Sequence, residues 1–193
     1  PSKISLIAET FFNVTHIIST VPPIKNNYDP ILNVFYPEIA KLKSLKWLGY
    51  LSTTGVYGNT NGCEVSECAT LNPTSKRAHR RLEAEKKWRS LVEGYRLPLH
   101  IFRLPGIYGP QRSSLTQIQN GLSRRIIKPD HKFNRIHVDD IVNTLYLSMH
   151  SPKTGAIYNI ADDEPAAPSD VIVFACGLLG VKPPPPIPFE IAK

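Results

Sequence analysis

The sequence is poor in cysteine and in long apolar runs, and each shortage excludes a class of protein. Its three cysteines, Cys63, Cys68 and Cys176, are an odd number without CxxC spacing. They indicate neither a disulfide framework nor a zinc site, so we expect reduced thiols and no bound metal. No apolar run approaches the roughly 20 residues of a membrane helix. We therefore expect no membrane partner.

The N-terminus lacks two further features. It has no positively charged segment followed by an apolar one, which is the pattern of a signal peptide. The chain opens at Pro1, and its single methionine is Met149. We therefore expect a cytoplasmic protein, or one of another reducing compartment, whose sequence is a processed product or a fragment.

The composition that is present indicates a globular protein. The chain has 193 residues, of which 41% are hydrophobic. This is enough to bury a sizeable core in one domain, or in one domain with a small lobe. The formal charge of +7 suits an anionic partner. A phosphorylated cofactor, a nucleotide sugar, nucleic acid and an acidic membrane all meet that description, and charge alone does not choose among them.

Segments typical of strands alternate with segments typical of helices. This alternation predicts an α/β fold with a Rossmann-like parallel sheet and helices on both faces. The glycines and prolines of 105–110 predict a loop, 133–138 reads as extended, and the tail 183–188 predicts polyproline II. The predicted strands are 14–20, 46–52, 98–104 and 156–161. The predicted helices are 28–43, 74–95, 113–122 and 169–179. A further helix is predicted to begin at Asp139 and Asp140.

Hydroxyl residues gather where the second predicted strand ends, in 51-LSTTGVYGNTNG-62. Ligands of parallel sheets bind beyond the carboxyl ends of the strands, and Ser19, Thr53 and Leu104 stand at three such ends. Ser and Thr side chains also bond readily to nearby backbone groups and cap turns. The stretch therefore has two interpretations, a local cap and a ligand-binding edge.

Six motifs occur in a fixed order along most of the chain: 19-STVPP-23, 51-LSTTGVYG-58, a helix start from Pro73 to Glu85, 103-RLPGIYGP-110, 135-RIHVDD-140 and 158-YNIADDEP-165. In this order the chain resembles the extended and atypical short-chain dehydrogenase/reductases, which include the NAD-dependent epimerase/dehydratase-like proteins. The resemblance implies that 1–111 is the remaining part of a Rossmann-like NAD(P)-binding domain. It also implies that 112–193 is a small C-terminal lobe, from which strand 156–161 returns to the main sheet.

The same resemblance implies roles for individual residues. Thr53 takes the place of the catalytic Ser or Thr that hydrogen-bonds a substrate oxygen. The basic stretch and the RIHVDD motif are implied to bind an anionic substrate through Arg124, Arg125, Arg135 and His137. The residues implied to bind NAD or NADP are Ser19, Thr20, Val21, Arg81, Leu104, Pro105, Gly106 and Ile107.

Two arginines stand where the family has its catalytic Tyr and Lys, which makes the active site atypical. In 75-SKRAHRRLEAE-85 these positions are Arg77 and Arg81. Arginine stays protonated near neutral pH, so Arg77 is a poor general acid or base, whereas Arg81 can still bind a ribose or phosphate. His79 falls on another helix face. Tyr57 and Tyr108 are the other candidate acids, at motif positions that shape loops.

The glycine fingerprint of the family is also missing. Family members begin with a strand and GxxGxxG, whose amides hold the cofactor pyrophosphate. The first glycine here is Gly49. By this resemblance about sixty residues that carry the first strands are absent. Either the chain is a fragment, or another chain supplies these strands, or cofactor binding is lost.

These observations predict an NAD(P)-dependent epimerase/dehydratase-like oxidoreductase acting on a nucleotide-linked or other anionic small molecule; a homo-oligomer is a possible assembly. The alternative is a non-catalytic Rossmann-fold scaffold or assembly subunit. A third reading is a nucleic-acid-binding derivative, because helix 74–95 is rich in Lys and Arg. Glu85 stands four residues from both Arg81 and Arg89, which predicts ordinary i,i+4 pairing and disfavours nucleic acid as a partner.

Overall fold

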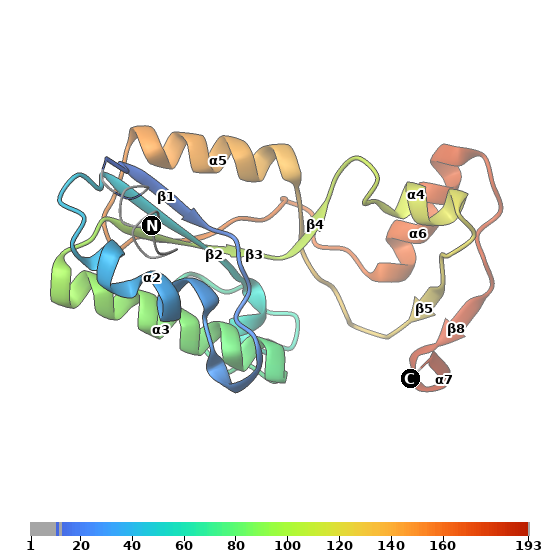
Figure 1. Cartoon of the computed structure of the whole chain (residues 1–193). Coiled ribbons are helices and arrows are strands. Elements are labelled where there is room, and N and C mark those ends of the chain that lie inside the picture. Colours follow the sequence, from blue (N-terminus) through green and yellow to red (C-terminus); the bar gives the residue numbers. More distant parts are fainter. Residues whose placement is uncertain (1–10, 12, 193) are drawn as a thin grey trace. The chain divides into compact units, whose positions relative to one another are not determined.

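The computed structural model describes residue 11 and residues 13–192, and it divides into two compact units (Figure 1). The first unit holds the described residues up to Thr60, together with Val65–Leu104 and Asn143–Ile160. The second holds Asn61–Glu64, Pro105–Val142 and the residues from Ala161 onward. The domain boundary predicted at residue 111 stays a prediction.

A four-stranded parallel sheet forms the centre of the first unit. Its order is β1-β2-β3-β7. Ser19 pairs with Tyr50, and Thr53 pairs with Leu104, so the carboxyl ends of the first three strands share one edge. The four predicted strands are thereby confirmed. Their bounds are β1 (His16–Ser19), β2 (Trp47–Thr53), β3 (Leu99–Leu104) and β7 (Ile157–Asn159).

Helices cover both faces of this sheet (Figure 1). The helices α2 (Pro30–Ala40) and α3 (Lys76–Tyr95) lie on one face, and α5 (Val138–His150) lies on the other. A short 3₁₀ turn, η1 (Lys25–Asn27), precedes α2. Another, η2 (Thr54–Tyr57), follows β2. The predicted Rossmann-like class is confirmed.

Local capping explains where α2 and α3 begin. Asp29 Oδ1 accepts the amides of Ile31 and Leu32 at 2.9 and 3.0 Å, and a proline occupies the first helical position. Ser75 Oγ accepts the Ala78 amide at 3.1 Å and so starts α3. These residues are common N-caps, because their oxygens satisfy amides that have no partner inside the helix.

The core lies between the sheet and the α2–α3 layer. Leu48, Tyr50 and Ile101 of the sheet are buried in one cluster with Trp88 and Leu91 of α3. Two further apolar side chains of α3, Leu82 and Val92, are half-buried. Trp88 Nε1 donates to Asp29 Oδ2 at 3.0 Å, which ties α3 to the start of α2.

An aromatic layer lies on the α5 face of the sheet. The His100 ring stacks on Trp47 and Tyr158, with centroids 5.8 and 6.5 Å apart. Trp47 Nε1 donates to Ser148 Oγ of α5 at 3.0 Å, so α5 is held against this layer. Burial lowers the pKa of His100, because the charged imidazolium loses its hydration there.

The second unit contains short parallel ribbons and several helices. The strands β4 (Gly106–Tyr108) and β6 (Arg135–His137) form one ribbon. The strands β5 (Arg125–Ile127) and β8 (Pro186–Pro188) form the other. The helices α4 (Ser114–Gln119) and α6 (Pro168–Leu179) pack together, and α7 (Phe189–Ala192) follows β8.

Two local predictions are wrong in this unit. The segment 105–110 is not wholly a loop, because Gly106–Tyr108 forms β4 with a partner strand far along the chain. The tail is extended, as predicted, but Pro186–Pro188 pairs with β5 in the basic stretch instead of standing alone as polyproline II. Both predictions used nearby glycines and prolines, and neither pattern reveals a partner that only folding supplies.

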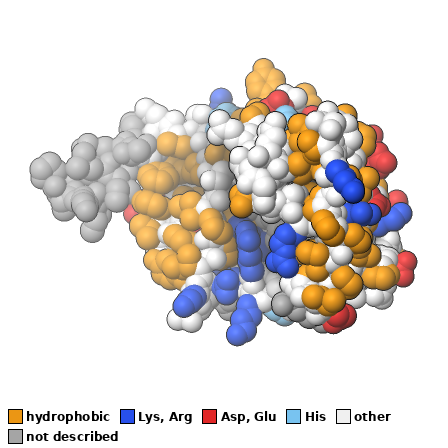
Figure 2. Space-filling view, turned by 90° about the vertical axis from the view of Figure 1, so that its right-hand side faces the viewer, with side chains coloured by type: hydrophobic (Ala, Val, Ile, Leu, Met, Phe, Trp, Pro, Cys, Tyr) orange, Lys and Arg blue, Asp and Glu red, His pale blue; other side chains and the backbone are white. Residues whose placement is uncertain are grey.

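Several large apolar side chains of the second unit are exposed. Figure 2 shows hydrophobic side chains gathered on one face of the molecule, with Lys and Arg among them. The exposed apolar residues of this unit include Leu122, Phe174, Leu178 and Ile191. No helix within the described residues is both long enough and apolar enough to cross a membrane.

Candidate functional site

The predicted site begins at the carboxyl edge of the sheet. Ser19, Thr53 and Leu104 are the last residues of β1, β2 and β3. Because the three strands are parallel neighbours, these residues meet at one edge, as the sequence predicts. This edge is where parallel α/β sheets bind ligands.

Thr53 forms a local cap at this edge. Its Oγ1 accepts the Gly55 amide at 3.2 Å and so begins η2. A hydroxyl that accepts one bond keeps its own proton for another acceptor. The cap and the ligand contact are therefore compatible, and the ligand contact stays a prediction.

Replacing Thr53 tests the cap directly. We expect Thr53→Val to lower the free energy of unfolding by about 1 kcal/mol, the usual cost of a lost N-cap. Thr53→Ser keeps the accepting oxygen and is expected to retain most of the stability. Urea unfolding of both variants provides the measurement. Equal stability of Thr53→Val and the parent protein would contradict the capping role.

Ser19 is a buried polar residue at this edge. It is 2% exposed, and its Oγ has no hydrogen-bond partner within the described residues. A buried hydroxyl without a partner is costly, so the site favours a ligand that supplies one. Thr20 is exposed and Val21 half-buried just beyond it. The predicted contact of these three residues with a cofactor stays a prediction.

The two arginines of α3 differ in their environments. Arg77 is exposed in the first turn of the helix, and His79 is also exposed. Arg81 is turned toward the sheet: its Nη1 donates to Tyr50 Oη and to Leu51 O, both at 3.0 Å. Burial raises the pKa of Tyr50 to about 12, so its phenol stays neutral near pH 7. Arg81 thus ties α3 to the end of β2.

The other predicted cofactor residues follow β3. Leu104 is buried at the end of the strand, Pro105 and Ile107 are half-buried, and Gly106 is exposed. Gly106 and Ile107 belong to β4 in the second unit. Of the residues predicted to bind the cofactor, those from Pro105 onward therefore belong to a different unit from Ser19, Thr20, Val21 and Arg81.

A buried ion pair lies beneath this edge, where the sequence predicted none. Arg103 and Glu85 are each 1% exposed, and Arg103 Nη2 donates to Glu85 Oε2 at 2.8 Å while Nε donates to Oε1 at 3.2 Å. Ser52 Oγ also donates to Glu85 Oε1. Burial opposes the charge of Arg103, but the bonds to Glu85 outweigh it and raise the Arg103 pKa. The predicted i,i+4 pairing of Glu85 on α3 is therefore wrong.

The network continues into the loop after η2. Arg103 Nη1 donates to Tyr57 Oη at 2.7 Å, and Tyr57 Oη donates to Asn159 Oδ1 at 2.6 Å. The Asn159 amide N–H donates to Glu67 Oε1 at 2.8 Å, and its Nδ2 donates to Val65 O at 3.2 Å. Tyr57 is thereby part of a buried scaffold. The one signal for this network in the sequence was Arg103, a charged residue inside the otherwise apolar predicted strand 98–104.

The residues predicted to bind substrate all lie in the second unit. Arg124 is exposed, and Arg125 of β5 is half-buried. Arg135 and His137 stand two residues apart on β6, so both side chains project from one face of the ribbon. The structure thus groups Arg135 with His137.

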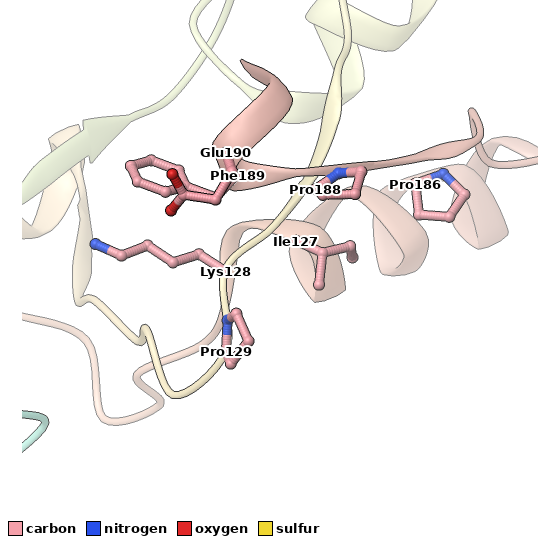
Figure 3. Close-up of a pocket in the computed structure, with 7 residues that line it drawn as sticks. All are labelled: Ile127, Lys128, Pro129, Pro186, Pro188, Phe189 and Glu190. Atoms are coloured by element: carbon pink, nitrogen blue, oxygen red, sulfur yellow. The ribbon is translucent and has the colours of Figure 1, made fainter. Parts of the chain in front are cut away.

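A separate pocket lies beside β5 and β8 (Figure 3). Its volume is about 580 Å³, and it is lined by Ile127, Lys128, Pro129, Pro186, Pro188, Phe189 and Glu190. The Lys128 ammonium lies 4.8 Å from the centre of the Phe189 ring. The pocket holds none of the predicted site residues. Among the described residues, no three His, Cys, Asp or Glu side chains are grouped to bind a metal ion.

Comparison with known protein sequences finds relatives of this chain. Protein YeeZ of Escherichia coli (strain K12) is 32% identical over 139 residues, which cover 70% of this chain and 47% of that protein. The dTDP-D-glucose 4,6-dehydratase of Dictyostelium discoideum is 28% identical over 160 residues, covering 72% of this chain and 37% of the dehydratase. The chain thus spans less than half of the length of these two relatives.

Solved structures support the same fold. A functionally unknown conserved protein from Silicibacter pomeroyi DSS is 44% identical with a TM-score of 0.88, over 93% of this chain and 63% of that one. The dTDP-glucose 4,6-dehydratase of Bacillus anthracis str. Ames, solved in complex with NAD, has a TM-score of 0.77 at 18% identity. The match covers 96% of this chain and 65% of the dehydratase chain. Residues 37–161, more than half of the chain, match the NAD dependent epimerase/dehydratase family. The chain therefore belongs to the NAD-dependent epimerase/dehydratase family.

Proposed function

We propose that this chain is part of an NAD(P)-dependent oxidoreductase that acts on a nucleotide-linked or other anionic small molecule. The observation that carries the proposal is the shared carboxyl edge of β1, β2 and β3, where the buried Ser19 hydroxyl has no hydrogen-bond partner among the residues that the structure describes. Family membership and the NAD of the Bacillus anthracis dehydratase support a dinucleotide as the ligand.

In this proposal the residues of the first unit serve the cofactor and the reacting group. A bound nicotinamide supplies the chemistry, because it accepts or returns a hydride. Ser19 Oγ gains a hydrogen-bond partner from the cofactor, and Thr20, Val21 and Leu104 lie beside it. The Thr53 hydroxyl donates a hydrogen bond to a substrate oxygen, and its Oγ1 still accepts the Gly55 amide.

A second candidate function is a non-catalytic scaffold or assembly subunit. The observation that favours it is the pair of arginines on α3. Arg77 is exposed and stays protonated, and Arg81 donates hydrogen bonds to Tyr50 and Leu51. Neither arginine therefore replaces the Tyr and Lys that transfer the proton in the family. Arg77→Tyr alone is accordingly expected to be insufficient for NAD(P)-dependent turnover, since Arg81 still replaces the lysine.

Calorimetric titration with NADH and NADPH tests the proposed function. We expect the 193-residue chain to bind either dinucleotide more weakly than micromolar, because its sequence has no GxxGxxG motif for the pyrophosphate. A longer form of the protein that carries an N-terminal GxxGxxG segment is expected to bind one of them at micromolar concentration.

The variant Arg81→Ala probes the ribose contact in the longer protein. We expect the affinity for dinucleotide to fall by about tenfold, which corresponds to one charge-assisted hydrogen bond. Arg77→Ala is the matched control, since Arg77 is one turn away and exposed. An unchanged affinity of Arg81→Ala would remove Arg81 from the site, and failure of the longer protein to bind either dinucleotide would favour the scaffold.

A further inference from the structure

The helix α6 has a buried face and an exposed apolar face. It packs against α4 (Figure 1) and β5, and its inward side chains Ile172, Ala175 and Cys176 are buried. On the opposite face Phe174 is 69% exposed and Leu178 is 64% exposed. Side chains four residues apart lie one above the other on a helix, so these two form one apolar surface. Exposed apolar patches of this kind mark interaction sites more often than isolated apolar side chains do.

The sequence of α6 is typical of a helix that is covered on all sides. No charged residue occurs between Asp170 and Lys182. A surface helix normally carries charged or polar residues on its outer face, whereas a helix that is apolar all round is buried. Val173 is exposed beside Phe174, and Val181 is exposed just beyond the end of the helix. We call four residues the α6 patch: Val173, Phe174, Leu178 and Val181. A second layer is expected to cover it.

Gly177 lies on the same face of α6, three residues from Phe174. Glycine is unfavourable inside a helix, because it loses more backbone freedom than any other residue. Gly177 does not have a positive φ, and a Cβ there would meet no atom of the described residues within 4 Å. The fold of the described chain therefore gives no reason for a glycine here. A partner helix that crosses at this point gives one, since the missing Cβ lets two backbones approach closely.

Asp170 and Lys182 carry opposite charges at the two ends of the α6 patch. Both residues are exposed, and neither belongs to an ion pair among the residues that the structure describes. Asp170 Oδ1 accepts one hydrogen bond, from Ser169 Oγ at 3.0 Å. Because a hydroxyl is neutral, this bond leaves the charge of the carboxylate unmatched. The two charges are therefore left for a partner.

These residues are arranged symmetrically about position 176 of the chain. Asp170 and Lys182 each stand six residues from it, and Phe174 and Leu178 each stand two residues from it. A second copy that lies antiparallel, related by a two-fold axis at this position, therefore brings each acidic end to the partner's basic end. The same operation brings Phe174 to the partner's Leu178, beside the partner's Gly177. Such a two-fold contact is self-complementary, because each residue and its counterpart exchange places.

We propose that two copies of this chain associate through an antiparallel pair of α6 helices. Phe174 of each copy packs against the partner's Gly177 and Leu178, and Asp170 pairs with the partner's Lys182. The contact covers the α6 patch of both copies and matches both charges. It includes none of the residues proposed to bind a cofactor or a substrate, so the inference goes beyond the proposed function.

Sedimentation velocity of the 193-residue protein measures the association. We expect a dimer with a dissociation constant of about 10 µM, since one helix pair is a small interface. Gly177→Gln places a bulky side chain at the crossing and is expected to weaken the dimer by about tenfold or more. Glutamine is also a better helix former than glycine, so the urea midpoint of the same variant is expected to rise. Weaker association of a more stable chain does not result from misfolding.

Gly94→Gln is the matched control. Gly94 is an exposed glycine inside α3, and a Cβ there would also meet no atom of the described residues within 4 Å. The urea midpoint of this variant is expected to rise as well, with no change in association. The comparison separates the effect of the crossing point from the general effect of glutamine on a helix.

Two charge reversals test the antiparallel orientation. Asp170→Lys and Lys182→Asp each place like charges at both ends of the contact, and each is expected to weaken association by about tenfold. In an equimolar mixture of the two variants, a mixed dimer regains opposite charges at both ends and is expected to form about as tightly as the parent dimer. Sedimentation of one variant with an N-terminal fluorophore, beside the other without a label, detects the mixed dimer.

Three results would overturn the proposal. The first is a single-chain mass for the parent protein at about 100 µM, well above the expected dissociation constant. The second is association that persists unchanged in Gly177→Gln, because the contact would then lie on another surface. The third is failure of the two charge variants to associate when mixed although each is weakened alone, because the ends of the helices would then not face each other.

Discussion

Glu85→Gln is expected to lower the free energy of unfolding by about 3 to 5 kcal/mol, the cost of breaking a buried ion pair at one partner. Glutamine keeps the size of the side chain but removes the charge that Arg103 pairs with. Arg103 is 1% exposed, so its guanidinium cannot regain water without unfolding the surrounding structure. Chemical unfolding of the variant and the parent protein in urea measures the difference.

Two further variants make this result specific to the buried pair. Glu83→Gln, on the same helix, breaks the exposed Glu83–Lys86 pair at 2.7 Å and is expected to cost at most about 0.5 kcal/mol. The double variant Glu85→Leu with Arg103→Met removes both charges and is expected to recover much of the stability. A loss of under 1 kcal/mol for Glu85→Gln would contradict the buried pair.

Gly58→Ala is expected to cost more than about 2 kcal/mol, since it combines backbone strain with a steric clash. Gly58 has φ of 75° and ψ of −143°, a conformation that side chains with a Cβ rarely adopt. A Cβ there would lie 1.8 Å from the backbone oxygen of Asn72. We therefore expect the alanine to push Gly58 and Asn72 apart, at the two ends of the loop 58–72. Asn159 and Arg103 bond to the middle of this loop at Val65 and Glu67.

Gly62→Ala is the matched control in the same loop. Gly62 also has a positive φ, of 79°, but a Cβ there would meet no atom of the described residues within 4 Å. It is expected to cost only about 1 kcal/mol of backbone strain. The difference between the two unfolding free energies measures the clash at Asn72. Equal losses in the two variants would show that Gly58 is required for its conformation alone.

The sequence by itself determined the fold class and the edge at which a ligand is expected. Strand and helix patterns are local, because side chains two residues apart share a strand face and side chains three or four apart share a helix face. The positions of β1, β2 and β3 followed from short apolar runs, and that of α3 followed from apolar residues at helical spacing. Their parallel order then brought Ser19, Thr53 and Leu104 to one edge without further information.

Only the tertiary structure decided which polar groups are partners. Glu85 was paired with its helix neighbours by spacing, but burial places its carboxylate against Arg103 of β3. Arg81 reaches Tyr50, and Arg135 is stacked on Phe133 beside Asp162. The glycines and prolines around β4 and β8 concealed two strands whose partners are distant in sequence. The physical reason is common to all of these: a hydrogen bond or ion pair depends on distance in space, and sequence spacing fixes that distance only within one helix or strand.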